Sequence, residues 1–314
     1  MPPSAQRRVS LLMTTVSLQA GLAGVAAVLS SLLAAMLFVA APPAAAALPS
    51  VGTNFSASGP YATTVTRAAS TTVYHPATLP DGALHPVVLW GNGTGASVSA
   101  YDGFLRHLAS HGFIVAAANT GSAGSGSAML AGIDVVAANP TLRASADLNR
   151  IGATGHSQGG GGALAAGRDA RVDTTFPLQP FTSGASGLRG PALLFAGEND
   201  VLVPPRRVRS AYAEAAATVP AGYAELEGAS HFTATGSVGG YRGAATAWAR
   251  WQLADDALAA PLFTGASPGL STSPEWSAYE ANTALRSLGT GTGTPTTPPP
   301  APEPTCRWWQ WWCR

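Results

Sequence analysis

A series of short apolar runs that alternate with segments of helical spacing constrains the fold of this chain more than any other feature. Such an alternation indicates a parallel sheet whose two faces are covered by helices, and therefore an α/β protein. In sheets of this kind, sites form beyond the carboxyl ends of the strands. The expected strands span residues 87–90, 113–118, 150–154, 192–196 and 223–226, and the expected helices span residues 101–110, 129–138, 160–167, 204–217 and 241–253.

Composition divides the 314 residues into four parts. In residues 1–47, Arg7 and Arg8 precede a long uncharged run rich in Ala, Leu and Val, and small residues end the segment at Ala47. This pattern predicts a cleaved export signal and a secreted protein. The run is long for such a signal, so an uncleaved membrane anchor is the alternative. Residues 48–288 are sufficient for one domain with its own core.

The other two parts lie at the carboxyl end. Residues 289–305 alternate Gly with Thr and then become rich in Pro, which predicts a linker. Residues 306–314 contain four Trp between Cys306 and Cys313. Export would place these cysteines in an oxidising compartment, where they can close a small disulfide ring. We expect an anchor for a polymer or lipid surface, with docking on the protein itself or a functionless end as alternatives.

Charge and residue usage exclude several classes of protein. The formal net charge is +1, and this balance argues against a nucleic-acid binder. Every basic residue is Arg, so lysine Schiff-base and P-loop chemistry are excluded. Both cysteines lie in the tail, and the sequence shows no cluster of Cys and His that would form a zinc site. We therefore expect neither a metal nor a cofactor.

A serine motif occurs twice, and its context separates the two copies. Residues 155–159 (GHSQG) and residues 265–269 (GASPG) both match G-x-S-x-G. A nucleophile elbow needs a strand, a sharp turn and a helix, and the residue after the serine must carry a backbone N–H. Ser157 meets these conditions, whereas Ser267 follows no strand and precedes Pro268, which has no N–H. The pattern favours Ser157 as a nucleophile over a Gly-rich structural turn.

Chain order then selects candidate partners for Ser157. In this motif the order is serine, acid, histidine, and His231 is the only one of six histidines that follows Ser157. Asp200 follows the expected strand 192–196 and is the preferred acid, while Glu198 in the same loop is the alternative. A serine hydroxyl needs a base at neutral pH. His231 would accept its proton, and Asp200 would orient the imidazole.

Two backbone N–H groups are needed to bind the oxyanion that forms in acyl transfer. Gln158 is expected to supply one of them, because it directly follows the nucleophile. The Gly-rich loop 91–95, which follows the strand 87–90, is expected to supply the other. A plain Gly-rich turn is the alternative for this loop.

Several segments together resemble a known family. They are residues 59–61 (GPY), 72–76 (TVYHP), 108–113 (LASHGF), 155–162 (GHSQGGGG), 193–200 (LLFAGEND) and 228–232 (GASHF). Through them, much of residues 59–256 resembles the bacterial polyester hydrolases, which are cutinase-like and include poly(ethylene terephthalate) hydrolases. The same branch also holds lipase-like and chlorophyllase-like enzymes. The resemblance implies the α/β-hydrolase fold, with a mostly parallel central sheet, helices on both faces and no large lid domain.

The resemblance also implies two further site residues. Counted back without a gap from residues 109–113, the first oxyanion donor of the family falls on Thr94, and a gap would move it to Asn92. The aromatic residue that contacts polymer rings falls on Phe181, for which a core position is the alternative. The chain departs from the family at Gln158, where Met is usual, and at Phe181, where many members have Trp.

We therefore expect a secreted, monomeric serine carboxyl-ester hydrolase that acts through an acyl-enzyme. Its expected substrates are polyester, cutin-like or lipid esters, including poly(ethylene terephthalate). A small-ester esterase or triacylglycerol lipase without polymer activity is one alternative. A surface-binding protein with a degenerate hydrolase core is another, and the complete set of Ser157, Asp200 and His231 argues against it.

Overall fold

The structure, a computed structural model, describes residues 48–80 and 82–288. All of these residues belong to one compact unit. The predicted export signal, linker and Trp-rich tail lie outside the described residues and stay predictions. Within the described ranges, no helix combines the length and the apolar character needed to cross a membrane.

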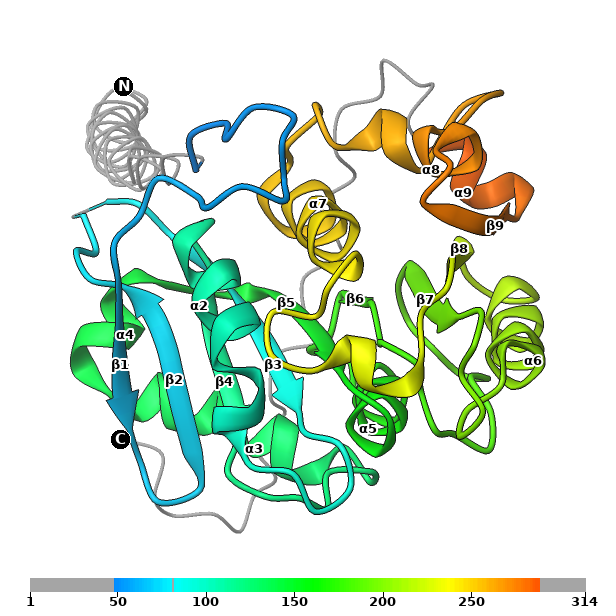
Figure 1. Cartoon of the computed structure of the whole chain (residues 1–314). Helices are drawn as coiled ribbons and strands as arrows, with labels where there is room; N and C mark the ends of the chain where they lie inside the picture. Colours follow the sequence, from blue (N-terminus) through cyan, green and yellow to red (C-terminus); the bar gives the residue numbers. More distant parts are fainter. Residues whose placement is uncertain (1–47, 81, 289–314) are drawn as a thin grey trace, which may run out of the picture. The chain divides into compact units, whose positions relative to one another are not determined.

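A nine-stranded sheet forms the centre of the unit, in the order β1-β2-β4-β3-β5-β6-β7-β8-β9. Neighbours from β4 to β8 in this order are parallel, while β1, β2 and β9 pair antiparallel. Figure 1 shows β1 and β9 at opposite edges. The strands are β1 (Thr63–Arg67), β2 (Thr71–Pro76), β3 (His85–Gly91), β4 (Ile114–Ala118), β5 (Ala146–Gly155), β6 (Thr174–Thr175), β7 (Ala192–Gly197), β8 (Ala221–Leu226) and β9 (Trp276–Ala281).

Helices cover both faces of the sheet because the central strands are apolar on both sides. In β3, Val88 and Trp90 pack in one core with α2 (Asp102–Ser110) and α7 (Tyr241–Ala254). Val87 and Leu89 alternate with them and face the opposite core. That side carries α3 (Ser127–Ala138), α4 (Pro140–Ser145), α5 (Gln158–Ala166) and α6 (Pro205–Ala216). The shorter elements are η1 (Val98–Tyr101), η2 (His231–Ala234), η3 (Ala260–Leu262), α8 (Gly269–Thr272) and α9 (Thr283–Ser287).

The predicted fold class is confirmed, since the sheet is open, mostly parallel and flanked by helices. The five expected strands correspond to β3, β4, β5, β7 and β8. The sequence reading missed the other four strands. β2 reads as polar because it contains Thr, Tyr and His, although every residue in it is buried. β6 is only two residues long, too short for any periodicity to show.

Buried histidines attach the first described segment to α2. His107 donates its Nε2–H to the carbonyl oxygen of Phe55 at 3.0 Å, and His111 donates to that of Ala57 at 2.9 Å. The two imidazole rings lie 4.6 Å apart, centroid to centroid. A carbonyl oxygen can only accept, so each histidine holds its proton on Nε2. These contacts require both rings to stay within the folded core.

Acid is expected to destabilise the fold between about pH 6.5 and about pH 4. Burial, together with the nearby charges of His111 and Arg242, lowers the pKa of His107 to about 4. Burial and neighbouring His231 lower the pKa of His156 to about 4 as well. Histidines in the unfolded chain titrate near pH 6.5, so the unfolded state binds protons first as the pH falls. The contribution of these histidines to the free energy of unfolding is therefore complete above about pH 6.5 and declines toward pH 4.

Urea unfolding at a series of pH values measures this decline. The variant His107→Gln loses one titrating group but keeps an N–H that can reach the Phe55 carbonyl. Its free energy of unfolding should fall less steeply over the same pH range. An identical slope in the two proteins would contradict the assignment of the acid sensitivity to His107.

Candidate active site

Ser157 lies on a tight turn between β5 and α5. Its backbone adopts φ 55° and ψ −119°, a strained conformation for a residue with a side chain. Close backbone packing holds the turn in place. A methyl group on Gly159 would lie 2.0 Å from the carbonyl oxygen of Gly91, and one on Gly155 would lie 2.6 Å from the same atom. Glycine at both positions lets the end of β3 meet the start of α5.

Three loops bring Ser157, His231 and Asp200 into one hydrogen-bonded series. Asp200 follows β7, and His231 follows β8 as the first residue of η2. His231 Nδ1 lies 2.7 Å from Asp200 Oδ2, and His231 Nε2 lies 2.9 Å from Ser157 Oγ. The side chain of Asp200 is fully buried, and that of His231 is 7% exposed. The series therefore runs from a buried carboxylate toward the surface at the serine.

The hydrogen bonds of Asp200 determine which nitrogen of His231 carries the proton. Asp200 Oδ1 accepts from the backbone N–H groups of Leu202 at 2.9 Å and Val203 at 2.8 Å, which leaves Oδ2 for the imidazole. A carboxylate oxygen accepts only, so His231 Nδ1 donates and Nε2 can accept the Ser157 hydroxyl proton. Glu198 lies elsewhere in the same loop, where its Oε2 accepts from the backbone N–H of Gly228 at 2.8 Å.

The two expected oxyanion donors lie at the ends of different strands. Thr94 is exposed in the loop after β3, and Gln158 is the first residue of α5. Among the described residues, the backbone N–H groups of Thr94 and Gln158 have no hydrogen-bond acceptor. The Oε1 atom of Gln158 is buried without a partner in the same part of the structure.

Asn92, the alternative to Thr94, is fully buried under this loop. Its amide nitrogen donates to the carbonyl oxygens of Ala118 at 2.8 Å and Thr120 at 2.9 Å. Its Oδ1 accepts from the indole N–H of Trp90 at 2.9 Å. Both polar atoms of the Asn92 side chain are thus hydrogen-bonded, and they connect the loop after β3 to the end of β4.

Phe181 lies on the surface beside the serine turn. Its backbone N–H donates to the carbonyl oxygen of Ser157 at 2.8 Å, and its side chain is 52% exposed. The guanidinium of Arg207 lies 5.5 Å from the centre of its ring. Phe181 is therefore not a core aromatic.

Sequence reasoning missed further exposed apolar side chains around the three residues. Val201 and Leu202 directly follow Asp200 and are 85% and 55% exposed, and Phe232 directly follows His231 and is 68% exposed. We call Phe181, Val201, Leu202 and Phe232 the apolar rim. The sequence signal for them was their position directly after a polar site residue in a loop. An apolar residue in an exposed loop is not covered by the core. Isolated exposed apolar residues need no explanation, but a group around one site indicates a binding surface.

Ser267 is not part of this site. It lies between η3 and α8, and it makes no hydrogen bond to Ser157, Asp200 or His231. Within residues 48–80 and 82–288, no group of three or more His, Cys, Asp or Glu side chains is arranged to hold a metal ion.

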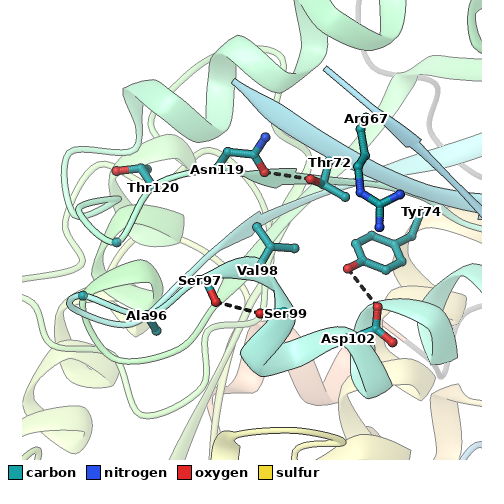
Figure 2. A pocket seen from close by; sticks show the side chains of 12 residues that line it. Arg67, Thr72, Tyr74, Ala96, Ser97, Val98, Ser99, Asp102, Asn119 and Thr120 are labelled. Atoms are coloured by element: carbon teal, nitrogen blue, oxygen red, sulfur yellow. Dashed lines mark hydrogen bonds between the residues drawn. The ribbon is translucent and has the colours of Figure 1, made fainter. Parts of the chain in front are cut away.

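A cavity of about 420 Å³ lies against the loop that carries Thr94, with Gly95 and Ala96 among its lining residues. Figure 2 shows that side chains lining it are largely bonded to one another, with Tyr74 donating to Asp102 and Thr72 donating to Asn119. Ser157, Asp200 and His231 do not line it. The cavity shares only a loop with the serine site.

Comparisons with known proteins point to one family. Bis(hydroxyethyl) terephthalate hydrolase from Streptomyces coelicolor is 29% identical over 171 residues, which cover 52% of this chain and 55% of that protein. Cutinase 2 from Thermobifida cellulosilytica is 31% identical over 151 residues, which cover 45% of this chain and 56% of that protein. Lipase 1 from Moraxella sp. is 34% identical over 132 residues, which cover 40% and 41%. The chain thus spans about half the length of the curated relatives it matches.

A family described as PET hydrolase-like matches residues 39–273. This range contains the sheet from β1 to β8, the serine turn and the loops that carry Asp200 and His231. The match covers well over half of the chain, and the resemblance expected from the sequence motifs is confirmed. The chain belongs to the PET hydrolase-like family.

Proposed function

We propose that this protein is a serine carboxyl-ester hydrolase in which Ser157 is the nucleophile, His231 the general base and Asp200 the residue that orients His231. The observation that carries the proposal is the hydrogen-bonded series from Asp200 through His231 to Ser157, with Ser157 on a strained strand-to-helix turn. Relatives named as a terephthalate-ester hydrolase, a cutinase and a lipase support ester hydrolysis as the class of reaction.

In the proposed reaction, the Ser157 oxygen attacks the ester carbonyl carbon while His231 Nε2 takes the hydroxyl proton. The N–H groups of Thr94 and Gln158 bind the oxyanion of the tetrahedral intermediate. The intermediate expels the alcohol, which receives the proton from His231, and an acyl-Ser157 ester remains. Water then repeats the sequence, with His231 as its base, and releases the carboxylic acid and free Ser157.

The apolar rim supports a hydrophobic ester as the substrate. The exposed residues Phe181, Val201, Leu202 and Phe232 each lie in or next to a turn or loop that carries the proposed nucleophile, base or acid. Such a surface favours the aromatic or aliphatic part of polyester, cutin-like or lipid esters, poly(ethylene terephthalate) included. A small-ester esterase or triacylglycerol lipase remains the alternative within the same chemistry.

Export and surface attachment complete the proposal. The uncharged run behind Arg7 and Arg8 supports secretion, with a membrane-anchored form as the alternative. The four Trp between Cys306 and Cys313 support contact with an insoluble polymer or lipid. We propose a monomer that meets its substrate at such a surface.

A substrate series tests the function. We expect hydrolysis of p-nitrophenyl butyrate and of bis(hydroxyethyl) terephthalate, measured by product release. Parallel assays on poly(ethylene terephthalate) film and on emulsified tributyrin distinguish a polyester hydrolase from a lipase. Absence of hydrolysis throughout the series would refute the proposal.

Replacing Leu202 with a polar residue is expected to weaken hydrolysis of the aromatic ester. Leu202→Ser removes apolar surface beside Asp200 and should lower kcat/KM for bis(hydroxyethyl) terephthalate about tenfold. Hydrolysis of p-nitrophenyl acetate, which has little apolar acyl surface, should change less. The matched control is Leu258→Ser, because Leu258 is 48% exposed but lies between α7 and η3. Equal effects of the two substitutions would exclude a role of the apolar rim in substrate binding.

A further inference from the structure

A buried chain of hydrogen bonds links the loop of Thr94 to the backbone of His231. The N–H of Gly93 donates to the phenol oxygen of Tyr101 at 3.1 Å. That oxygen lies 2.9 Å from His156 Nδ1, and His156 Nε2 lies 3.0 Å from the carbonyl oxygen of His231. Tyr101 and His156 are 1% and 3% exposed, so the chain is shielded from water.

The acceptor at one end, the His231 carbonyl, and the donor at the other, the Gly93 N–H, determine the direction of every bond in this chain. The His231 carbonyl can only accept, so His156 Nε2 carries a proton. Neutral His156 then presents a lone pair at Nδ1, which accepts the Tyr101 hydroxyl proton. The phenol oxygen keeps a lone pair for the Gly93 N–H. Each group is satisfied in one arrangement only. Burial holds the pKa of His156 at about 4, which keeps this arrangement intact at neutral pH.

A further hydrogen bond of Gly93 orients the peptide that carries the Thr94 N–H. The carbonyl oxygen of Gly93 accepts from the backbone N–H of Ala96 at 3.0 Å, and the described chain contains no cis peptide bond. In a trans peptide the C=O and the N–H point in opposite directions. The Thr94 N–H therefore points away from Ala96. Tyr101 holds Gly93 from its other side, through the preceding N–H.

Gly93, Tyr101 and His156 are in direct contact. A methyl group on Gly93 would lie 2.9 Å from the Tyr101 oxygen and 3.2 Å from His156 Nδ1. The Tyr101 ring also packs on Trp90, with 4.9 Å between centroids, so its hydroxyl has little freedom to move. The rings of His156 and His231 are in contact at a tilt of 43°, with 4.6 Å between their centroids.

We propose that Tyr101 is a positioning residue, whose hydroxyl fixes the position of the Thr94 N–H relative to His231, through His156. The inference rests on the proposed function, in which Thr94 binds the oxyanion and His231 moves the proton. Both groups act in the same step, the attack of Ser157 on the ester carbonyl, so their separation has to be fixed before the substrate arrives. Tyr101 itself touches no reacting atom.

The variant Tyr101→Phe removes the hydroxyl and keeps the ring on Trp90. We expect kcat for p-nitrophenyl butyrate to fall about tenfold to hundredfold, because a displaced donor binds the transition state less well. KM should stay within about twofold, since the ground-state ester makes little use of that donor. The matched control is Tyr279→Phe on β9, which loses a 2.7 Å hydrogen bond to the carbonyl oxygen of Phe263 and should keep its kcat. Thermal unfolding of both variants measures the loss of stability.

A second measurement does not depend on activity. In ¹⁵N-labelled protein, the Nδ1 resonance of His156 and the amide resonance of Thr94 should both shift in Tyr101→Phe and not in Tyr279→Phe. If Tyr101→Phe does not fold, Gly93→Ala replaces it, because its methyl group displaces the same hydroxyl. The same loss of kcat is then expected.

The outcomes separate this inference from the proposed function. Wild-type protein without Ser157-dependent ester hydrolysis refutes the proposed function, while the NMR shifts still test the hydrogen-bonded chain. Active wild-type protein with unchanged kcat in Tyr101→Phe overturns the positioning role. A change confined to KM, or an equal loss in Tyr279→Phe, overturns it as well.

Discussion

Ser157→Ala is expected to lower the rate of ester hydrolysis by about 10⁵-fold to 10⁶-fold, close to the effect of removing the whole set of reactive side chains. Without the Ser157 oxygen, no acyl-enzyme can form, and His231 has no hydroxyl to deprotonate. His231→Ala should cost about as much, because the hydroxyl without its base is a weak nucleophile. The measurement is kcat for p-nitrophenyl butyrate, with circular dichroism to show that the fold persists.

Non-additivity gives the sharper test of the same assignment. The double variant Ser157→Ala/His231→Ala should lose little more activity than either single variant, because the two residues act in one step. Ser267→Ala is the matched control, since Ser267 lies in the second G-x-S-x-G motif and makes no hydrogen bond to the series. Loss of activity in Ser267→Ala together with an active Ser157→Ala would refute the assignment of the nucleophile.

The second large effect is expected on stability. Arg250 and Asp256 form an ion pair at 2.9 Å, and their side chains are 1% and 2% exposed. Arg250 also donates to the carbonyl oxygens of His111 at 3.2 Å and Pro49 at 2.8 Å, which ties α7 to α2 and to the first described segment. Asp256→Asn leaves the guanidinium buried without its counter-charge. Breaking a buried pair in this way costs about 3–5 kcal/mol in the free energy of unfolding.

The neighbouring residue provides a matched control. Asp255 pairs with Arg150, but its side chain is 54% exposed and that of Arg150 is 38% exposed. Asp255→Asn should change the free energy of unfolding by less than about 1 kcal/mol, because exposed pairs contribute little. Asn also tolerates the left-handed conformation that Asp255 adopts, with φ 54°. The free energies of unfolding of the two variants, measured with urea, should therefore differ by several kcal/mol. Similar values would show that the Arg250–Asp256 pair contributes no more stability than the Arg150–Asp255 pair.

Part of the site could be predicted because its signals are local. The G-x-S-x-G turn needs only the residues next to Ser157, and chain order narrowed the histidine to His231. In the folded structure, His231 lies within hydrogen-bond distance of Asp200 on one side and of Ser157 on the other. Glu198 could not be separated from Asp200 by pattern alone, because both follow the same strand. The folded structure makes the distinction, because the Asp200 carboxylate lies 2.7 Å from His231 Nδ1, whereas Glu198 accepts from the backbone N–H of Gly228.

Other features could not be predicted because they depend on contacts between distant segments. Asn92 and Thr94 are two residues apart in one Gly-rich loop. Asn92 is nevertheless buried, with its side-chain amide hydrogen-bonded, whereas Thr94 is exposed. Tyr101 reaches His156 across 55 positions, which no spacing rule anticipates. The strand β2 escaped detection because its polar residues are buried in the folded protein, between two neighbouring strands.

The sequence by itself determined the α/β class and the position of Ser157. Both follow from short-range patterns, since apolar periodicity selects the secondary structure and glycines permit a strained turn. Only the tertiary structure decided which side chains surround Ser157 and how they are bonded. The apolar rim, the tie between Tyr101 and His156, and the buried Arg250–Asp256 pair each join residues from separate elements. Their geometry exists only after the sheet has assembled, because the free chain has no contact that holds these groups together.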